Sequence, residues 1–297
     1  MEKIITVLTA TYNRAHLLPD LYHSLCRQTN PNFDWVIVDD GSNDGTEELF
    51  NKWTSEEHSF HIKYLKKTNG GKNLAINDGV KVTKTPFVMI VDSDDFLTDD
   101  AIEFLSLRAK DTLLDQEIAG ISGLKGNENK SPLGIPHFKE NEFIVCNNLE
   151  RKKYGLEKDA CEVYKTSILQ SHPFVVWEEE KFSPEEIVWD TIALEGLSLK
   201  WYNKVTMIIR YQENGLTKNS FSLMRKNPMG YAMLYKHRVQ LSKKKGDKIY
   251  WNCQLFANSI IAKNLSYGFE DNLTFYSIIS LPLGAILAIR RKLQFRI

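Results

Sequence analysis

Short apolar runs alternate with longer amphipathic stretches near the start of the chain. Three runs are apolar or β-branched and too short for globular helices, which predicts buried strands: residues 4–8, 35–38 and 87–91. Apolar residues recur at helical spacing in three further segments: residues 17–25, 49–53 and 102–109. The sequence Thr98-Asp99-Asp100 predicts a capped start for the last of these helices. This alternation predicts an α/β domain with a mostly parallel central sheet flanked by helices.

Length, charge and cysteine content narrow the class of protein. The chain has 297 residues, which fits one large α/β domain with an appendage. Its 38 basic and 38 acidic residues cancel, so no overall charge favours nucleic acid as a partner. The four cysteines have no Cys-x-x-Cys spacing, and we expect free thiols in a reducing cytoplasm. Residues 1–3 run straight into a strand without signal-peptide features, and residues 123–142 have the composition of an irregular loop.

Polar and acidic residues follow each of the three predicted strands. The segment 9–14 follows the first strand, 39–46 the second and 92–95 the third. Ligands of open α/β sheets bind outside the carboxyl ends of the strands. We therefore expect Thr11, Asp39 and Asp92 to gather around one crevice.

The acidic run after the third strand predicts a metal site. Asp92, Asp94 and Asp95 are close in sequence, and such carboxylates stay ionised together only if a cation neutralises them. Ligands that are all oxygen favour Mg²⁺ or Mn²⁺ over zinc, and these ions keep positions that phosphates can fill. The alternative is a plain surface turn, in which Asp and Ser are common.

Taken together, the motifs resemble glycosyltransferase family 2 with its GT-A, Rossmann-like fold. The resemblance rests on Thr9–Arg14, Val38–Thr46, Gly70–Gly79 and Val91–Asp95, in this order and spacing. It is strong over residues 3–110 and looser to about residue 215. It implies a catalytic domain over residues 1–218 and leaves a helical, basic C-terminal extension over residues 219–297.

The resemblance also implies which residues bind the nucleotide. Thr9, Thr11 and Tyr12 would line the base, Arg14 would approach the nucleotide, and Asp39 would accept a hydrogen bond from the base with Asp40 beside it. Lys72 and Ser93 complete the implied set. Three simpler interpretations stay open: Tyr12 as a packing aromatic, Asp40 as a turn-forming acid and Lys72 as an exposed lysine.

A later acidic segment is the candidate source of the general base. The family usually supplies this base from an acidic pair at the start of a helix, which Phe182–Asp190 resembles. Ser183 with Glu186 forms a predicted capping box, which leaves Glu185 as the preferred base and Asp190 as the alternative. The cluster would otherwise only cap a helix.

The segment Tyr211–Thr217 resembles one that closes over pyrophosphate or acceptor in bacterial family members.

The resemblance, together with the acidic run, implies a metal-dependent, inverting glycosyltransferase of the bacterial capsular or exopolysaccharide type. Its donor would be a nucleotide sugar, with UDP preferred, and its acceptor a hydroxyl of a glycan or lipid-linked molecule. Two rivals stay open: a nucleotidyltransferase acting on sugar phosphates, and a non-catalytic nucleotide-binding member of the family.

The C-terminal tail carries an apolar run followed by basic residues. Residues 275–289 are mostly apolar, are shorter than the roughly 20 residues of a membrane span, and precede Arg290, Arg291 and Lys292. This pattern predicts an interfacial anchor that holds the protein at the inner face of the cell membrane. The alternative is a helix that docks on the protein itself.

Overall fold

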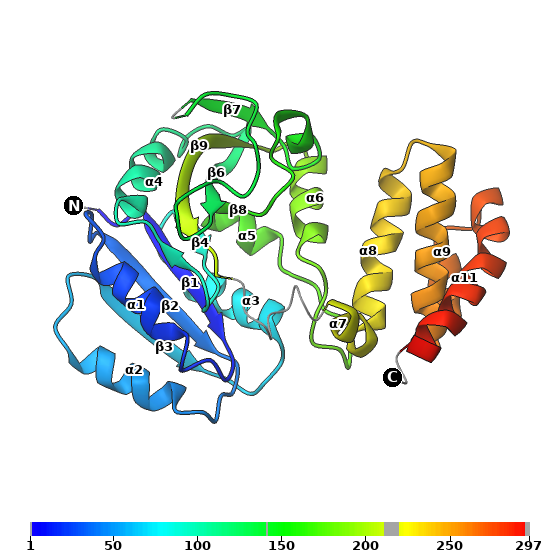
Figure 1. Cartoon of the computed structure of the whole chain (residues 1–297), viewed down its shortest axis with the longest axis horizontal. Coiled ribbons are helices and arrows are strands. Elements are labelled where there is room, and N and C mark those ends of the chain that lie inside the picture. Colours follow the sequence, from blue (N-terminus) through cyan, green and yellow to red (C-terminus); the bar gives the residue numbers. More distant parts are fainter. Residues whose placement is uncertain (1, 141, 211–219, 295–297) are drawn as a thin grey trace. The chain divides into compact units, whose positions relative to one another are not determined.

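The computed structural model describes residues 2–140, 142–210 and 220–294, and its chain forms two compact units (Figure 1). The first, which we call the sheet unit, contains Met1–Pro173 and Val188–Gln212. The second, the helical unit, contains Phe174–Ile187 and Glu213–Ile297. The segment 174–187 therefore belongs with the C-terminal helices, a division that differs from the boundary expected at residue 218.

The sheet unit alternates strands and helices, as the hydrophobic pattern predicts. Its strands are β1 (Ile5–Thr11), β2 (Phe33–Asp39), β3 (His61–Lys66), β4 (Phe87–Ile90), β5 (Phe96–Leu97), β6 (Ile118–Gly126), β7 (Phe143–Cys146), β8 (Ala160–Lys165) and β9 (Ser198–Ile208). Its helices are α1 (Leu18–Cys26), α2 (Thr46–Ser55), α3 (Lys72–Val82), α4 (Ala101–Lys110), the 3₁₀ turn η1 (Arg151–Tyr154), α5 (Thr166–Ser171) and α6 (Glu186–Leu194), whose first turn starts in the helical unit.

The strands form one mixed sheet in the order β3-β2-β1-β4-β8-β6-β9-β5, with β7 paired to β9. The four strands from β3 to β4 are mutually parallel, whereas β8 is antiparallel to both β4 and β6. The α/β class is therefore confirmed, but the expected parallel arrangement holds for the N-terminal half of the sheet. Strands that are buried on both faces have the same apolar pattern in either direction, so the pattern carries no information on direction.

Helices cover both faces of the N-terminal half of the sheet (Figure 1). Side chains of α1, α2 and α4 share one apolar core with β1, β2 and β4. Helix α3 packs on the other face against β1 and β2. Gly79 permits this close approach, because a Cβ atom at its position would lie 2.1 Å from Cδ1 of Leu8.

Helix α4 forms where the sequence predicts it, but its cap comes from elsewhere. The Asp100 side chain makes no capping hydrogen bond, and the Thr98 hydroxyl donates to the Asp100 carboxylate. The Ile102 N–H instead donates to the side-chain oxygen of Gln28, at 2.9 Å. A distant glutamine satisfies the helix terminus, and no local pattern could have predicted this partner.

The helical unit contains five helices within the part of the chain that the structure describes. They are α7 (Ser220–Lys226), α8 (Pro228–Leu241), α9 (Lys245–Ile261), α10 (Leu265–Phe269) and α11 (Phe275–Gln294). The Glu180 carboxylate accepts hydrogen bonds from the N–H groups of Met229 and Gly230, each at 2.7 Å. Because Glu180 thus satisfies the N-terminus of α8, the segment 174–187 is tied to the C-terminal helices.

We predict that Gln28→Ala lowers the free energy of unfolding by about 2–3 kcal/mol. The buried Gln28 side chain donates to the carbonyls of Ser24 and Thr98 in addition to accepting from Ile102, so its loss leaves buried backbone groups without a partner. Urea unfolding followed by tryptophan fluorescence measures the change. Gln116→Ala, at an exposed position, is the matched control, and an equal effect of both substitutions would contradict this account.

Candidate active site

The polar ends of three neighbouring strands meet at one edge of the sheet. Thr11 pairs directly with Asp39 in the β1–β2 register, and the Asp40 N–H donates to the Thr11 carbonyl at 2.8 Å. On the other side of β1, the Val91 N–H donates to the Leu8 carbonyl, so the turn after β4 lies at the same edge. The three strand ends therefore lie at the same edge of the sheet, and the crevice around Thr11, Asp39 and Asp92 stays a prediction.

Asp39 ends β2 and is fully buried. Its Oδ1 atom accepts from the Ser42 N–H at 2.8 Å, and its Oδ2 atom accepts from the Tyr64 hydroxyl at 2.5 Å. Burial and the neighbouring Asp39 carboxylate raise the pKa of Tyr64 far above its ordinary value, so the phenol remains a donor. Tyr64 therefore fixes Asp39 at the strand end, a partner that no sequence motif predicts.

Asp40 connects the second strand to the loop before α3. Its two carboxylate oxygens accept from the N–H groups of Gly70 and Gly71, at 2.8 and 2.7 Å. Gly71 has φ +98°, a conformation that residues with a side chain rarely adopt. The carboxylate thus holds the N-terminal end of α3 in place, and Lys72 is the first residue of that helix.

The loop after β1 combines structural and accessible groups. Thr9 is buried, and its hydroxyl accepts a hydrogen bond from the Trp35 ring nitrogen at 3.1 Å. The Thr11 hydroxyl is also buried, and it has no hydrogen-bond partner among the described residues. Tyr12 is 49% exposed. Asn13, at φ +52°, receives the Asn43 N–H on its side-chain oxygen and thereby joins this loop to the one after β2.

Each acidic side chain of the turn after β4 forms an ion pair with a different basic residue. Asp92 Oδ1 lies 2.7 Å from Lys72 Nζ, and Asp94 Oδ2 lies 3.0 Å from Arg14 Nη1. Asp95 Oδ2 lies 3.0 Å from Lys125 Nζ, in a pair that is largely buried. Ser93 is buried between these acids. The three cations come from the loop after β1, from α3 and from β6, so the turn connects three elements.

These ion pairs set the charge state of the turn. Desolvation raises the pKa of Asp92, but the cations of Lys72 and Lys125 outweigh it and lower this pKa to about 2. Burial raises the pKa of Asp95 to about 6, with Lys125 opposing the rise and Asp92 adding to it. Burial alone would lower the pKa of Lys125, yet the two carboxylates raise it well above its ordinary value. Lys125 therefore stays charged inside the protein.

The acidic turn is not, by itself, a preformed metal cage. Within the described residues, no three histidine, cysteine, aspartate or glutamate side chains lie close enough together to hold a metal ion. Asp92 and Asp94 are the better fit to a divalent ion, because their side chains are 37% and 16% exposed and offer hard oxygen donors. Asp95 is more deeply buried and engaged by Lys125.

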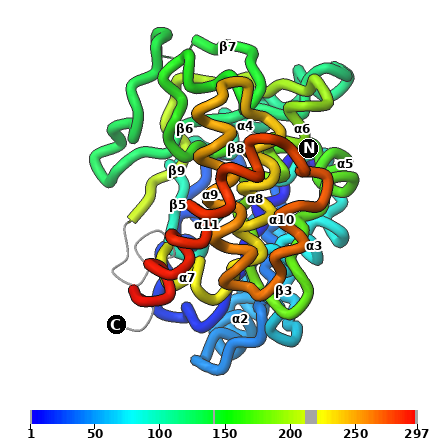
Figure 2. Tube along the Cα trace, turned by 90° about the vertical axis from the view of Figure 1, so that its right-hand side faces the viewer, coloured from blue at the N-terminus to red at the C-terminus, as the bar shows by residue number. Residues whose placement is uncertain are grey.

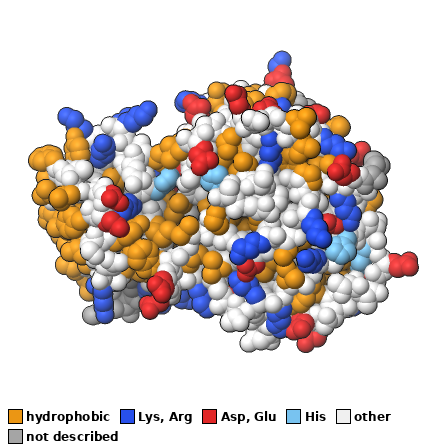
Figure 3. All heavy atoms as spheres, turned by 180° about the vertical axis from the view of Figure 1, so that it is seen from behind, with side chains coloured by type: hydrophobic (Ala, Val, Ile, Leu, Met, Phe, Trp, Pro, Cys, Tyr) orange, Lys and Arg blue, Asp and Glu red, His pale blue; other side chains and the backbone are white. Residues whose placement is uncertain are grey.

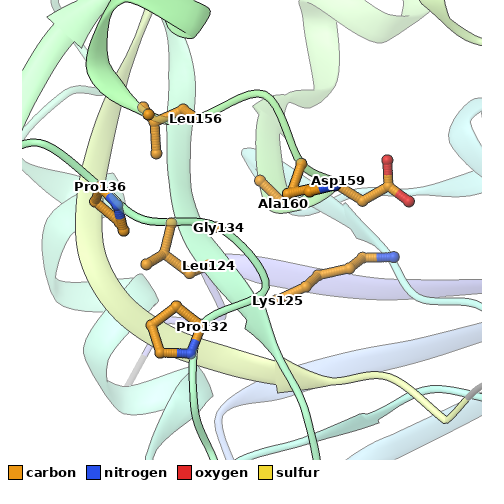
Figure 4. A pocket seen from close by; sticks show the side chains of 10 residues that line it. Leu124, Lys125, Pro132, Gly134, Pro136, Leu156, Asp159 and Ala160 are labelled. Atoms are coloured by element: carbon orange, nitrogen blue, oxygen red, sulfur yellow. The ribbon is translucent and has the colours of Figure 1, made fainter.

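A small hollow lies beside Lys125 (Figure 4). The apolar side chains of Leu124, Pro132 and Pro136 line one side of it. The ammonium group of Lys125 and the carboxylate of Asp159 extend the other way. The aliphatic part of Lys125 thus borders an apolar wall, which accounts for its burial.

The structure places the three candidate bases differently. Glu185 and Glu186 belong to the helical unit, where Glu186 Oε1 lies 3.2 Å from Arg238 Nη2. Asp190 belongs to the sheet unit and is buried in α6, whereas Glu185 is partly exposed. Helix α6 begins at Glu186, two residues later than Pro184, where the predicted capping box would start it.

Two tryptophans near this segment pack against other aromatic rings. Trp189 stacks on Tyr164 with ring centroids 4.6 Å apart, and Trp177 makes an edge contact with Tyr267. The segment Tyr211–Thr217, which the sequence analysis singled out, lies outside the described residues.

Comparison with known proteins gives a family and a fold. A family model described as Glycosyl transferase family 2 matches residues 6–174, more than half of the chain. The poly(ribitol-phosphate) beta-N-acetylglucosaminyltransferase TarP of Staphylococcus aureus (strain N315) is 33% identical over 135 residues, which cover 45% of this chain and 41% of TarP. The chain spans less than half the length of the relatives that it matches in sequence.

Solved structures resemble the whole chain at low identity. Residues 1–349 of S. aureus TarS, in complex with UDP-GlcNAc, align with a TM-score of 0.56 and 19% identity, covering 95% of this chain and 79% of that one. The mannosyltransferase PcManGT of Pyrobaculum calidifontis, in complex with GDP-Man and Mn²⁺, aligns with a TM-score of 0.55 and 16% identity, covering 97% and 81%. This likeness concerns the fold, and it confirms the expected α/β class with C-terminal helices.

We predict that Lys125→Met destabilises the protein by about 3 kcal/mol, because it removes one partner of a buried ion pair and leaves Asp95 uncompensated. The double variant Lys125→Met/Asp95→Asn recovers part of that loss, since it removes the buried charge as well. Urea unfolding of the single and double variants measures both effects. A double variant that is no more stable than Lys125→Met would show that the ion pair is not the source of the loss.

Proposed function

The chain belongs to glycosyl transferase family 2, and we propose that it transfers a sugar from a nucleotide-sugar donor to a hydroxyl group of an acceptor. The observation that carries this proposal is the acidic turn after β4, whose partly exposed carboxylates Asp92 and Asp94 are paired with Lys72 and Arg14. Two carboxylates and two cations at one edge of a sheet suit a ligand that brings both a diphosphate and a divalent cation.

A UDP-linked donor is the preferred form of this substrate. Asp39 ends β2 at the same edge, and a fixed carboxylate there can select a base by accepting its N–H group. Two further groups beside Asp39 suit contact with the base. The Thr11 hydroxyl, which has no hydrogen-bond partner among the described residues, offers a polar contact, and the exposed ring of Tyr12 offers a stacking contact. The structural relative TarS is in complex with UDP-GlcNAc, which supports UDP as the nucleotide.

We assign Mn²⁺ or Mg²⁺ to Asp92 and Asp94. When bound, the ion would stabilise negative charge on the diphosphate leaving group. The residues of this chain would then exchange partners: Lys72 and Arg14, which neutralise the carboxylates in the structure, would turn their charge to the diphosphate. Asp40 acts indirectly, because it holds the loop that begins α3 and so positions Lys72.

Glu185 is the proposed general base, with Asp190 as the alternative. A base must reach the acceptor hydroxyl, and Glu185 is partly exposed whereas Asp190 is buried. Glu186 is engaged by Arg238. Glu185 would take the hydroxyl proton as the acceptor oxygen attacks the anomeric carbon from the face opposite the nucleotide. One displacement of this kind inverts the anomeric configuration.

The proposed acceptor is a glycan or a lipid-linked molecule used in cell-surface polysaccharide synthesis. The relative TarP is named for transfer to poly(ribitol-phosphate), a polymer rich in hydroxyl groups, which supports an acceptor of this class. The proposed place of action is the cytoplasm, at the inner face of the cell membrane, with the C-terminal tail as the peripheral attachment. The basic and apolar character of residues 275–292 supports this location.

We expect a panel of nucleotide sugars, assayed for nucleotide release with Mn²⁺ or Mg²⁺ present, to yield UDP from at least one UDP-sugar. The exchange of ion pairs described above requires Asp94, so Asp94→Asn should nearly abolish donor binding and turnover. Asp99→Asn, which alters an exposed acid close by, is the matched control. Release of pyrophosphate would favour a nucleotidyltransferase, and nucleotide binding without turnover would favour a non-catalytic family member.

We predict that Glu185→Gln keeps donor affinity and lowers turnover by about two to four orders of magnitude, as expected for loss of a general base. Glu178→Gln changes an exposed glutamate of the same segment and should leave turnover unaltered. Steady-state rates and donor Kd values, measured on the same preparations, separate binding from chemistry. A larger effect of Asp190→Asn than of Glu185→Gln would assign the base to Asp190.

A further inference from the structure

Helix α11 buries small or polar side chains and exposes large apolar ones. The residues that it buries are small or polar: Ser277, Ser280, Gly284, Ala288 and Arg291. They recur every three or four positions, which places them on one face of the helix. A surface helix of a globular protein usually buries its large apolar residues instead.

The buried face packs closely on α9. A Cβ atom at Gly284 would lie 2.7 Å from Cβ of Phe256, so only glycine permits this approach. The Ser280 hydroxyl lies 3.2 Å from the Ile249 carbonyl, and the Arg291 guanidinium donates to Gln254. Helix α9 thus covers the inward face of α11, and the two helices lie side by side in Figures 1 and 2. Arg291 belongs to this packed face.

The outward face of α11 carries the large apolar side chains. They are Phe275, Ile278, Ile279, Leu283, Ile286, Ile289 and Leu293. Ile286 and Ile289 are 63% and 62% exposed, so the face is substantially open. Figure 3 shows apolar side chains gathered on the helical unit, at the left of the view. An apolar stripe that runs the length of a helix marks an interaction surface rather than scattered exposure.

Basic residues flank this stripe at both ends. Arg290 and Lys292 are exposed in its last turns, and Lys248 lies 5.8 Å from the ring of Tyr276 at its start. Lys243 and Lys244 precede α9, and Lys245 is its first residue, whereas Asp247 is the acid of this stretch. Six basic side chains therefore accompany the apolar face, against Asp247 and the two exposed acids just before α11, Glu270 and Asp271, which lie near a further cation, Lys236.

We propose that the outward face of α11 docks on an anionic lipid bilayer, with its apolar stripe at the level of the acyl chains and the basic residues at the phosphates. This inference rests on the proposed peripheral location and names the surface responsible for it. Within the described residues, no helix is long and apolar enough to span a bilayer, so α11 would lie along the interface. A tightly packed small-residue face on one side and a large apolar face on the other suits lipid contact.

The charges favour a lipid surface over a second copy of the chain. Two copies joined through parallel α11 helices would bring their Arg290 and Lys292 side chains together, and an antiparallel pair would bring them to Lys248 at the start of the other α11. Like charges across an interface oppose association. An anionic bilayer complements the same charges and accepts apolar side chains between its headgroups.

The test is flotation of the full-length protein with vesicles of phosphatidylcholine, with and without phosphatidylglycerol. We expect binding to the anionic vesicles at low salt and partial release at high salt, because salt screens only the electrostatic share. Leu283→Glu/Ile286→Glu should weaken binding by at least about tenfold, since it removes two apolar insertions. Leu114→Glu is the matched control, because it changes a leucine that is 92% exposed in the sheet unit.

The outcomes separate this inference from the proposed activity. Arg290→Glu/Lys292→Glu should weaken binding to anionic vesicles and reduce its salt dependence. UDP release with a water-soluble acceptor tests the transferase independently and should be unaltered by substitutions in α11. Full-length protein that stays unbound at low salt, or binding that Leu283→Glu/Ile286→Glu leaves unchanged, would overturn the inference. A dimer in light scattering that Ile286→Glu dissociates, together with no vesicle binding, would also overturn the inference. It would show that the face docks on a second copy of the chain.

Discussion

The architecture of the site depends on carboxylates crowded at the ends of adjacent parallel strands. Asp39, Asp40, Asp92, Asp94 and Asp95 lie at or just beyond the ends of β2 and β4, and both strands pair with β1. Charges this close require neutralisation. The chain meets that requirement in two ways, with N–H and O–H donors for the first pair and with basic side chains for the other three.

Each neutralising contact also positions another part of the site. Asp40 fixes the two glycines before α3, the helix presents Lys72, and Lys72 pairs with Asp92. The carboxylates that are more exposed hold cations that a diphosphate could attract away, whereas the buried Asp95–Lys125 pair has no such access. The turn therefore combines one buried ion pair with two partly exposed ones, an arrangement that suits the proposed metal–diphosphate ligand.

The sequence predicts what depends on neighbours along the chain. The strands before Thr11, Asp39 and Asp92, and the helices after them, follow from apolar runs and spacing, and their common edge follows from parallel pairing. The sequence pattern does not predict contacts between residues that are distant along the chain. The local sequences around Tyr64, Lys125 and Gln28 carry no sign of their partners. Only the folded chain brings these side chains to Asp39, Asp95 and Ile102.

The C-terminal helix shows the same limit. Periodicity predicts that residues 275–292 form a helix with an apolar side, but not which side the protein covers. That depends on α9, whose Phe256 accepts only glycine at position 284 and so selects the small-residue face of α11. Once that face is buried, the large apolar residues have no place inside the helical unit. Packing specificity on one side of a helix thus creates the exposed surface on the other.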